Sequence, residues 1–174
     1  MLKKILLVLV ALVLVFAVVV ALQPSEFHVE RSITVDAPAS KVFGEVNDFH
    51  KWDAWSPWAK LDPNSKVSFE GPQAGEGAVM TWAGNSEVGA GKMTLVESKP
   101  DELVKMIDFT EPFEGTSGAQ FAFKPDGDKT TVTWSMDDDH TFVEKAMCLI
   151  MNGKAMVGEQ MEQGLTKLKQ VSES

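Results

Sequence analysis

An unbroken apolar run at residues 5–22 limits how the first part of the chain can fold. Its 18 residues include no charged residue, no glycine and no proline. As a helix rising about 1.5 Å per residue, the run would be roughly 27 Å long, close to the thickness of a bilayer hydrocarbon core. A cleaved signal peptide has a shorter apolar core of about 7–15 residues. We therefore expect residues 1–24 to form an uncleaved membrane anchor, with a removed signal peptide as the alternative.

The basic residues near this run indicate its orientation. Lys3 and Lys4 precede it, and the next basic residue is Arg31. Basic residues are enriched on the cytoplasmic side of membrane segments, so the N-terminus is expected in the cytoplasm. Residues 25–174 are then expected outside the inner membrane, as the extracytoplasmic domain of a single-pass protein.

The remainder of the chain is acidic, with 14 basic and 25 acidic residues after Leu22. A net charge of −11 repels a phosphate backbone, so nucleic-acid binding is not expected. The single cysteine, Cys148, excludes an internal disulfide and a cysteine-based zinc site. The three histidines lie far apart without metal-ligand spacing, and we expect neither a metal nor another cofactor.

Alternation and turn signals predict a sheet preceded by two short helical segments. Residues 27–35 alternate apolar and polar side chains, as in a half-buried strand. Pro38 suits the first turn of a short helix, and an aromatic-rich helical turn follows at residues 49–58. Breaks that contain Gly, Pro or Asp then separate six apolar segments, which predicts an antiparallel meander. The segments are Val67–Phe69, Ala78–Trp82, Lys92–Val96, Leu103–Phe109, Gln120–Phe123 and Thr131–Met136.

The C-terminal part predicts one long helix. Residues 141–144 fit the S/T-x-x-E capping box, so the helix should begin at Phe142. Apolar residues then recur every three or four positions as far as Leu168, which predicts a helix of about 28 residues. Three glycines interrupt it, and each marks either a close approach to the backbone or a kink: Gly153, Gly158 and Gly164.

These elements predict an α+β fold in which a curved antiparallel sheet of about seven strands wraps around the long C-terminal helix. Such a sheet encloses more space than its own side chains easily fill, so a cavity is expected between sheet and helix. Short motifs along residues 27–170 are similar to those of a known family. They include Arg31-Ser32-Ile33-Thr34-Val35-Asp36-Ala37-Pro38, Asn47-Asp48-Phe49, Ser56-Pro57-Trp58, Gly84-Asn85, Pro112-Phe113-Glu114, Val132-Thr133-Trp134 and Gly164-Leu165.

In the order and spacing of these motifs, residues 25–174 resemble the helix-grip (START/Bet v 1-like) fold of the SRPBCC superfamily. More narrowly, they resemble the bacterial polyketide cyclase/dehydrase-like group. The resemblance implies a cavity for an apolar or amphipathic small molecule. It does not imply catalysis, because binders and enzymes share the fold.

Ten residues are candidates for lining such a cavity. They are Trp55, Trp58, Met80, Trp82, Met106, Asp108, Phe121, Trp134, Met147 and Met151. Trp52, Trp55 and Trp58 recur at helical spacing, and could form a lid over the ligand, pack the short helix into the core, or dock on lipid headgroups. The methionines suit either an adaptable pocket or ordinary core filling.

Asp108 is the candidate acid or base. It shares a strand phase with Met106, and if this phase faces the cavity the carboxyl group could orient a ligand or move a proton. If the phase that begins at Leu103 faces inward instead, Asp108 lies in water. Asp137–His140 similarly form either a cation site or a solvated turn before the helix. Cys148 has apolar neighbours and is interpreted as a small core residue.

Three functions remain open. The sequence shows no recognisable catalytic constellation, so the first is a membrane-anchored extracytoplasmic domain that binds a hydrophobic small molecule without chemistry. The second is a polyketide cyclase/dehydrase-type enzyme with Asp108 or a histidine as acid or base. The third is an acidic domain that binds a basic protein partner at the membrane.

Overall fold

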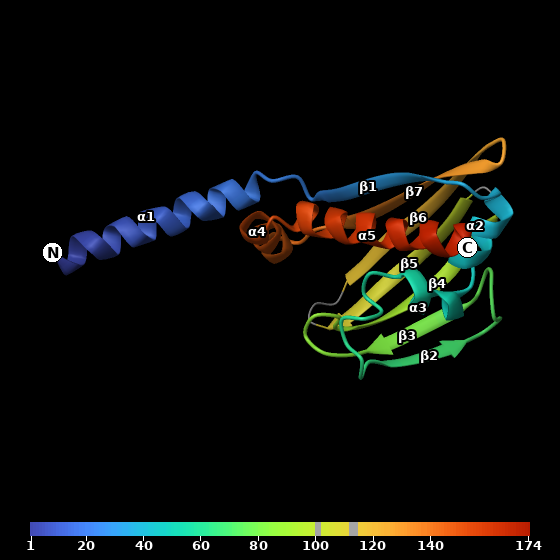
Figure 1. The fold of residues 1–174 in the computed structure, drawn as a ribbon. Helices are drawn as coiled ribbons and strands as arrows, with labels where there is room; N and C mark the ends of the chain where they lie inside the picture. The colour runs from blue at the N-terminus through green and yellow to red at the C-terminus, as the bar shows by residue number, and fades with distance from the viewer. Residues whose placement is uncertain (100–101, 112–114) are drawn as a thin grey trace.

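The computed structural model describes residues 1–99, 102–111 and 115–174, with their side chains except at 102, 104–111, 115 and 116. In this part of the chain, an apolar helix is followed by a domain whose antiparallel sheet curves around C-terminal helices (Figure 1). The predicted α+β helix-grip fold is confirmed.

The first helix, α1 (Leu2–Ala21), projects away from the domain (Figure 1). By length and composition it could cross a membrane, and a signal sequence near an N-terminus would pass the same test. Val20 is the one buried residue of α1, which is described throughout. Apart from Val20 and the partly exposed Ala17, every residue of this helix is exposed.

In the described ranges, seven strands form one antiparallel sheet in the order β1-β7-β6-β5-β4-β3-β2. The strands are β1 (Glu26–Val35), β2 (Lys66–Glu70), β3 (Val79–Ala83), β4 (Ala90–Lys99), β5 (Glu102–Glu111), β6 (Gly115–Asp126) and β7 (Lys129–Asp139). β2 to β7 form the predicted meander, and β1 pairs with β7 from Glu26 opposite Asp139 to Val35 opposite Thr130. An irregularity in the β4–β5 register between Leu95 and Glu97 accompanies the curvature.

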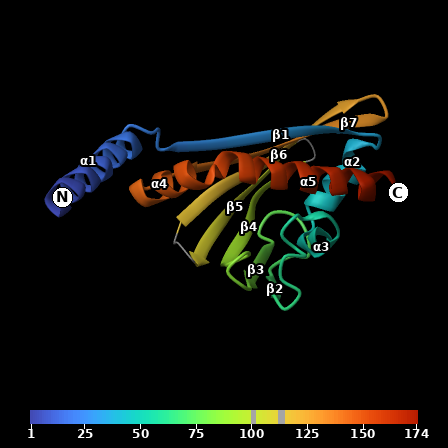
Figure 2. The ribbon, with the colours of Figure 1, turned by 60° about the vertical axis from the view of Figure 1, so that its left-hand side comes forward.

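Three short helical segments join β1 to β2, and two helices end the chain. They are α2 (Ala39–Val46), the 3₁₀ turn η1 (Phe49–Lys51), α3 (Trp52–Trp55), α4 (Phe142–Met151) and α5 (Gly153–Glu173). α5 lies along the concave side of the sheet and contacts β1, α2 and α3 (Figure 2). The predicted capping box is confirmed, because Glu144 N donates to Thr141 Oγ1 and Thr141 N donates to Glu144 Oε2.

The long C-terminal helix is interrupted, and the three glycines have different roles. Asn152 adopts a left-handed conformation with φ 52°, which ends α4 and lets α5 begin at Gly153. Gly153 therefore marks a kink. Within α5, Gly158 faces the flexible end of the Arg31 side chain, and Gly164 closely approaches the Pro57 and Trp134 rings.

Aromatic rings fill the middle of the space between sheet and α5. Phe121 stacks on Trp134 with ring centroids 4.8 Å apart, and Trp55 packs edge-on against both. All three side chains are almost fully buried. The Trp55 indole donates to the Glu45 carbonyl at 3.1 Å, and Trp52 donates to the Val46 carbonyl at 2.9 Å. These contacts pack α3 into the core.

We expect Gly164→Ala to lower stability. An added Cβ would lie 2.9 Å from Pro57 Cδ and 3.0 Å from Trp134 Cζ3, and neither ring can swing aside. Overpacking of about 1–3 kcal/mol should exceed the roughly 1 kcal/mol that alanine gains in helix propensity. Thermal unfolding of the full chain in mild detergent, followed by near-ultraviolet circular dichroism, measures the change.

Gly158→Ala is the matched control. Its Cβ would meet only the guanidinium end of Arg31, a flexible side chain that can move. The exposed Arg31–Glu162 ion pair contributes at most about 1 kcal/mol, which the better helix propensity offsets. Equal losses of stability in the two variants would contradict the close-approach interpretation of Gly164.

Candidate ligand-binding site

A pocket of about 220 Å³ lies where α4 meets α5, against the ends of β1 and β7. Five elements contribute to it: β1, β6, β7, α4 and α5. Its lining combines apolar side chains with two carboxylates, a hydroxyl and an imidazole. The lining residues are Phe27, Ser117, Met136, Asp137, Asp138, His140, Cys148, Gly153 and Val157.

A hydrogen-bonded carboxylate fixes the polar part of the pocket. The buried Ser117 hydroxyl donates to Asp138 Oδ2 at 2.9 Å, and Asp139 N donates to Asp138 Oδ1 at 2.8 Å. His28 Nδ1 lies 2.6 Å from Asp137 Oδ1 on the exposed side of the β1–β7 pair. Both oxygens of Asp138 are therefore engaged within the protein, which holds this carboxylate in one position.

Stacked rings form the wall nearest the apolar helix α1. Phe27 pairs with Asp138 in the β1–β7 register and stacks on His140 with ring centroids 4.4 Å apart. His140 N donates to the carbonyl of Ser25, which ties the turn after β7 to the segment that follows α1. The Lys154 ammonium lies 5.6 Å from the Phe27 ring centroid. The pocket is thus built at the end of the domain that adjoins α1.

The kink between α4 and α5 forms the opposite wall. A Cβ at Gly153 would lie 2.9 Å from Cys148 Sγ, so a larger residue there would push the two helices apart. Cys148 is partly buried and packs against the core, as expected for a small core residue. Val157 follows one turn into α5 and adds an apolar side chain.

The N-terminus of α4 is held by its capping box. Partial burial acts to raise the pKa of Glu144, but hydrogen bonds from the Thr141 backbone and hydroxyl, with His140 nearby, outweigh it. The pKa of Glu144 therefore lies below its ordinary value. This carboxylate stabilises α4 above the ordinary glutamate pKa, and the contribution is lost as the pH falls through the lower folded value.

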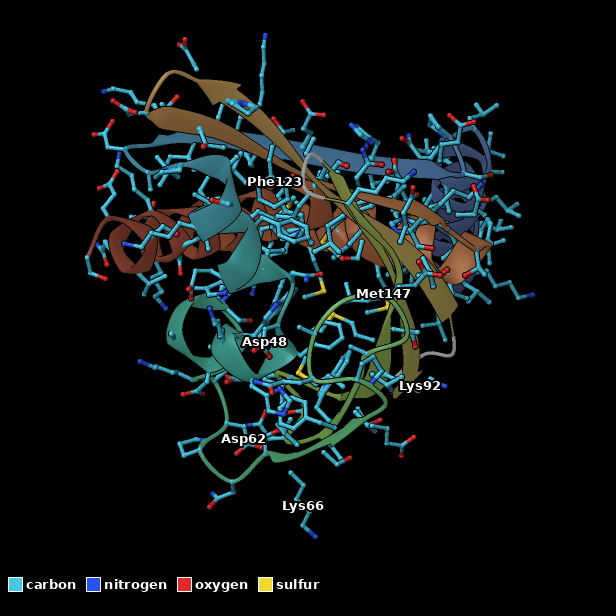
Figure 3. The ribbon with its side chains drawn as sticks, turned by 90° about the vertical axis from the view of Figure 1, so that its right-hand side faces the viewer. Asp48, Asp62, Lys66, Lys92, Phe123 and Met147 are labelled. Atoms are coloured by element: carbon cyan, nitrogen blue, oxygen red, sulfur yellow. The ribbon has the colours of Figure 1, made fainter. Side chains whose placement is uncertain are left out.

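Two buried carboxylates in another part of the domain fasten loops (Figure 3). Burial acts to raise the pKa of Asp48, but hydrogen bonds from His50 and Gln73 outweigh it and hold the pKa below its usual range. Asp62 accepts hydrogen bonds from the backbone N of Asn64 at 2.9 Å and of Asn85 at 2.7 Å. These bonds give both carboxylates a structural role.

The structure distributes the ten predicted cavity residues over three environments. Trp55, Phe121 and Trp134 form the buried ring cluster, and Trp58, Met80 and Trp82 are partly buried against the hydrophobic core. Met147 and Met151 lie exposed on α4, where Figure 3 labels Met147. Met106 and Asp108 belong to β5, with Asp108 opposite Lys92, but their side chains lie outside the described ones. Among the described side chains, none of the ten lines this pocket.

The residues that do line the pocket carried a different interpretation in the sequence. Asp137–His140 suggested a cation site or a solvated turn. The structure instead places three of them against Phe27, a residue more than a hundred positions away. Within the described ranges, no group of three histidine, cysteine or acidic side chains could hold a metal ion. The useful signals were the helix cap and the Asn152-Gly153 break.

Comparison with known proteins assigns the family. The model of the family described as "Polyketide cyclase / dehydrase and lipid transport" matches residues 26–173. The chain belongs to this family. It is a polyketide cyclase/dehydrase-type SRPBCC domain, and such domains typically bind hydrophobic ligands. A comparison with proteins of curated function gives no match.

Solved structures share the fold. A protein from Thermobifida fusca is 25% identical with a TM-score of 0.62, over 83% of this chain and 92% of that one. The Aha1 dimer from Colwellia psychrerythraea gives 15% identity and a TM-score of 0.60, over 84% and 96% of the two chains. Ara h 8.0201 is 12% identical with a TM-score of 0.57, over 84% of this chain and 97% of that one. These likenesses show the helix-grip architecture of the SRPBCC family.

We expect Thr141→Ala to loosen α4 specifically. Loss of the cap costs about 1 kcal/mol. All residues of α4 are described, and none of them is buried, so core packing does not compensate for this loss. Hydrogen–deuterium exchange should become faster in residues 142–151 while β7 keeps its protection. Thr166→Ala, which removes an exposed hydroxyl bonded to the Glu162 carbonyl on α5, is the control and should leave α4 unchanged.

The same cap should make α4 sensitive to acid. Because the pKa of folded Glu144 is lowered, protection of residues 142–151 should decline as the pH falls below the ordinary glutamate value of 4.5. Glu144→Gln removes the titrating group, so the extra decline relative to β7 should disappear in that variant. An identical acid profile in both proteins would exclude Glu144 as its source.

Proposed function

We propose that the protein is a membrane-anchored domain, residues 25–174 on an anchor of residues 1–24, that binds an apolar or amphipathic small molecule without chemistry. The observation that carries the proposal is the pocket of about 220 Å³ beside the end of α1. Apolar walls from Phe27, Met136 and Val157 surround it, and Asp138 supplies a fixed polar group.

The size and charge of the pocket limit the class of molecule that it can bind. Ligand pockets commonly measure about 300–1,000 Å³, so this one suits a small molecule or one end of a longer one. Asp137 and Asp138 disfavour an anionic group in it. A neutral or cationic head that can hydrogen-bond, joined to an apolar body, fits the lining best.

The same geometry favours binding over catalysis. Asp138 is the carboxylate best placed in the pocket, and both its oxygens already accept hydrogen bonds from Ser117 and Asp139. A proton-transferring carboxylate needs an oxygen directed at its substrate. The polyketide cyclase/dehydrase alternative would have to use another group, such as the sequence candidate Asp108.

The anchor and its orientation are supported by the first 25 residues. α1 is 20 residues long, and apart from Lys3 and Lys4 it carries no charge. These lysines favour a cytoplasmic N-terminus, which places residues 25–174 on the outside of the inner membrane.

Native mass spectrometry of the full chain, extracted from its own membrane, tests the ligand. We expect a small-molecule adduct on the wild type that is largely lost in Val157→Trp, because the indole fills the pocket. Gln163→Trp, at an exposed position on α5, should keep it. A wild type without any adduct, or a folded Val157→Trp protein that retains it, would refute the proposed site.

Carbonate extraction and protease treatment test the anchor. We expect the chain to stay in the membrane pellet at high pH and to retain residues 1–24 by mass. Protease added to intact spheroplasts should digest residues 25–174 while a cytoplasmic marker survives. Release by carbonate would disprove the anchor, and protection of the domain in intact spheroplasts would disprove its orientation.

A further inference from the structure

α4 exposes apolar side chains on the face where a surface helix normally carries polar ones. Ile150 is 71% exposed and Val143 is 55% exposed. The charged residues Glu144 and Lys145 are only partly exposed, on the opposite face with Cys148. The outward face consists of Phe142, Val143, Met147, Leu149, Ile150 and Met151, which we call the α4 apolar face. This polarity is the reverse of an ordinary amphipathic surface helix.

α4 lies next to the end of α1. α4 contacts α1, and Figures 1 and 2 both show α4 beside the C-terminal end of that helix. Val20, in the last turn of α1, is fully buried. Lys145 Nζ donates to the Gln23 carbonyl at 3.3 Å, so α4 is also hydrogen-bonded to the segment just after α1.

These contacts set the depth of α4 relative to a bilayer. A helix the length of α1 just crosses the hydrocarbon core, so its last turn lies at the membrane interface. α4 packs on that turn and must lie at the same depth. Interfacial helices bury an apolar face about 5–10 Å into the boundary between headgroups and acyl chains.

We propose that α4 is an interfacial membrane helix whose apolar face lies in the lipid leaflet from which α1 emerges. The proposal rests on the proposed anchoring by α1. The proposal also explains how a ligand could reach the pocket. Cys148, on the other side of α4, lines the pocket, so α4 lies between the lipid and the binding site. The ligand class is then a bilayer-dissolved molecule.

Charge indicates which lipid surface α4 can bind. α4 contains one acidic and one basic residue, Glu144 and Lys145, and follows three aspartates at 137–139. The domain as a whole is strongly acidic, so attraction to anionic headgroups is excluded as the driving force. Docking must come from apolar burial, and a neutral phosphatidylcholine surface suffices for it.

The test is lipid quenching of a label on α4 in the full chain. In a Cys148→Ser background, Ile150→Cys carries an environment-sensitive nitrobenzoxadiazole label, and Gln163→Cys on α5 carries the same label as the control. Each protein is reconstituted in phosphatidylcholine vesicles with or without nitroxide-bearing lipid. We expect a blue-shifted label at 150 that nitroxide quenches about twofold or more, and a label at 163 that stays water-like and unquenched.

Each other outcome overturns the proposal in a distinguishable way. If the label at 150 is no more quenched than that at 163 while the protein resists carbonate extraction, docking fails and the anchor stands. If the protein is extracted, the anchor fails and docking with it. A blue-shifted label that nitroxide lipid does not quench would mean that protein, such as a second copy of the chain, covers α4.

A second variant tests whether the label inserts into the membrane independently of α4. Val143→Asp combined with Leu149→Asp charges the α4 apolar face at exposed positions, so the core and the near-ultraviolet spectrum should be unchanged. Quenching of the label at 150 should then fall at least about twofold, because charged groups at this depth oppose insertion. Undiminished quenching would show that the helix is not what inserts.

Discussion

The contact of α5 with the aromatic rings of the sheet determines where this domain can hold anything else. At Gly164 the helix backbone rests directly on Trp134 and Pro57, and the stacked Phe121 and edge-on Trp55 complete the layer. These rings are buried almost completely and occupy the part of the space between sheet and helix that lies under Gly164. The pocket lies at the end of the domain that adjoins α1, where Asn152 ends α4 and the chain turns before α5.

Much of the fold could be predicted because its signals are local. Alternation at 27–35, the breaks at 71–77, 84–85 and 125–128 and the cap at Thr141 each depend on a few neighbouring residues, and all of them agree with the structure. The predicted breaks at 99–101 and 111–112 lie partly outside the described residues. Whether a side chain is buried depends on residues that are distant in the sequence. The spacing of Trp52, Trp55 and Trp58 is compatible with both a lid and packing into the core, and the structure shows that the first two indoles bond to carbonyls of α2.

The pocket was hidden from the sequence for the same reason. His140 and Asp138 resemble a solvated turn until β1 pairs with β7 and brings Phe27 against them. Similarly, the apolar recurrence at 142–168 does not distinguish an inward face from an outward one. In α5 the recurring residues Met161, Leu165 and Leu168 are buried, whereas in α4 the apolar residues mostly point outward.

This difference between α4 and α5 gives the two helices different stabilities and different uses. α5 is fixed by core burial, but α4, described over its whole length, has no buried residue and depends on the Thr141 cap and on its contacts with α1 and α5. An element held by caps and edge contacts opens at lower free energy than one held by a core. A lipid surface against the α4 apolar face would stabilise it without fixing it to the sheet. α4, which helps to line the pocket, can therefore open while the buried aromatic rings under α5 keep their packing.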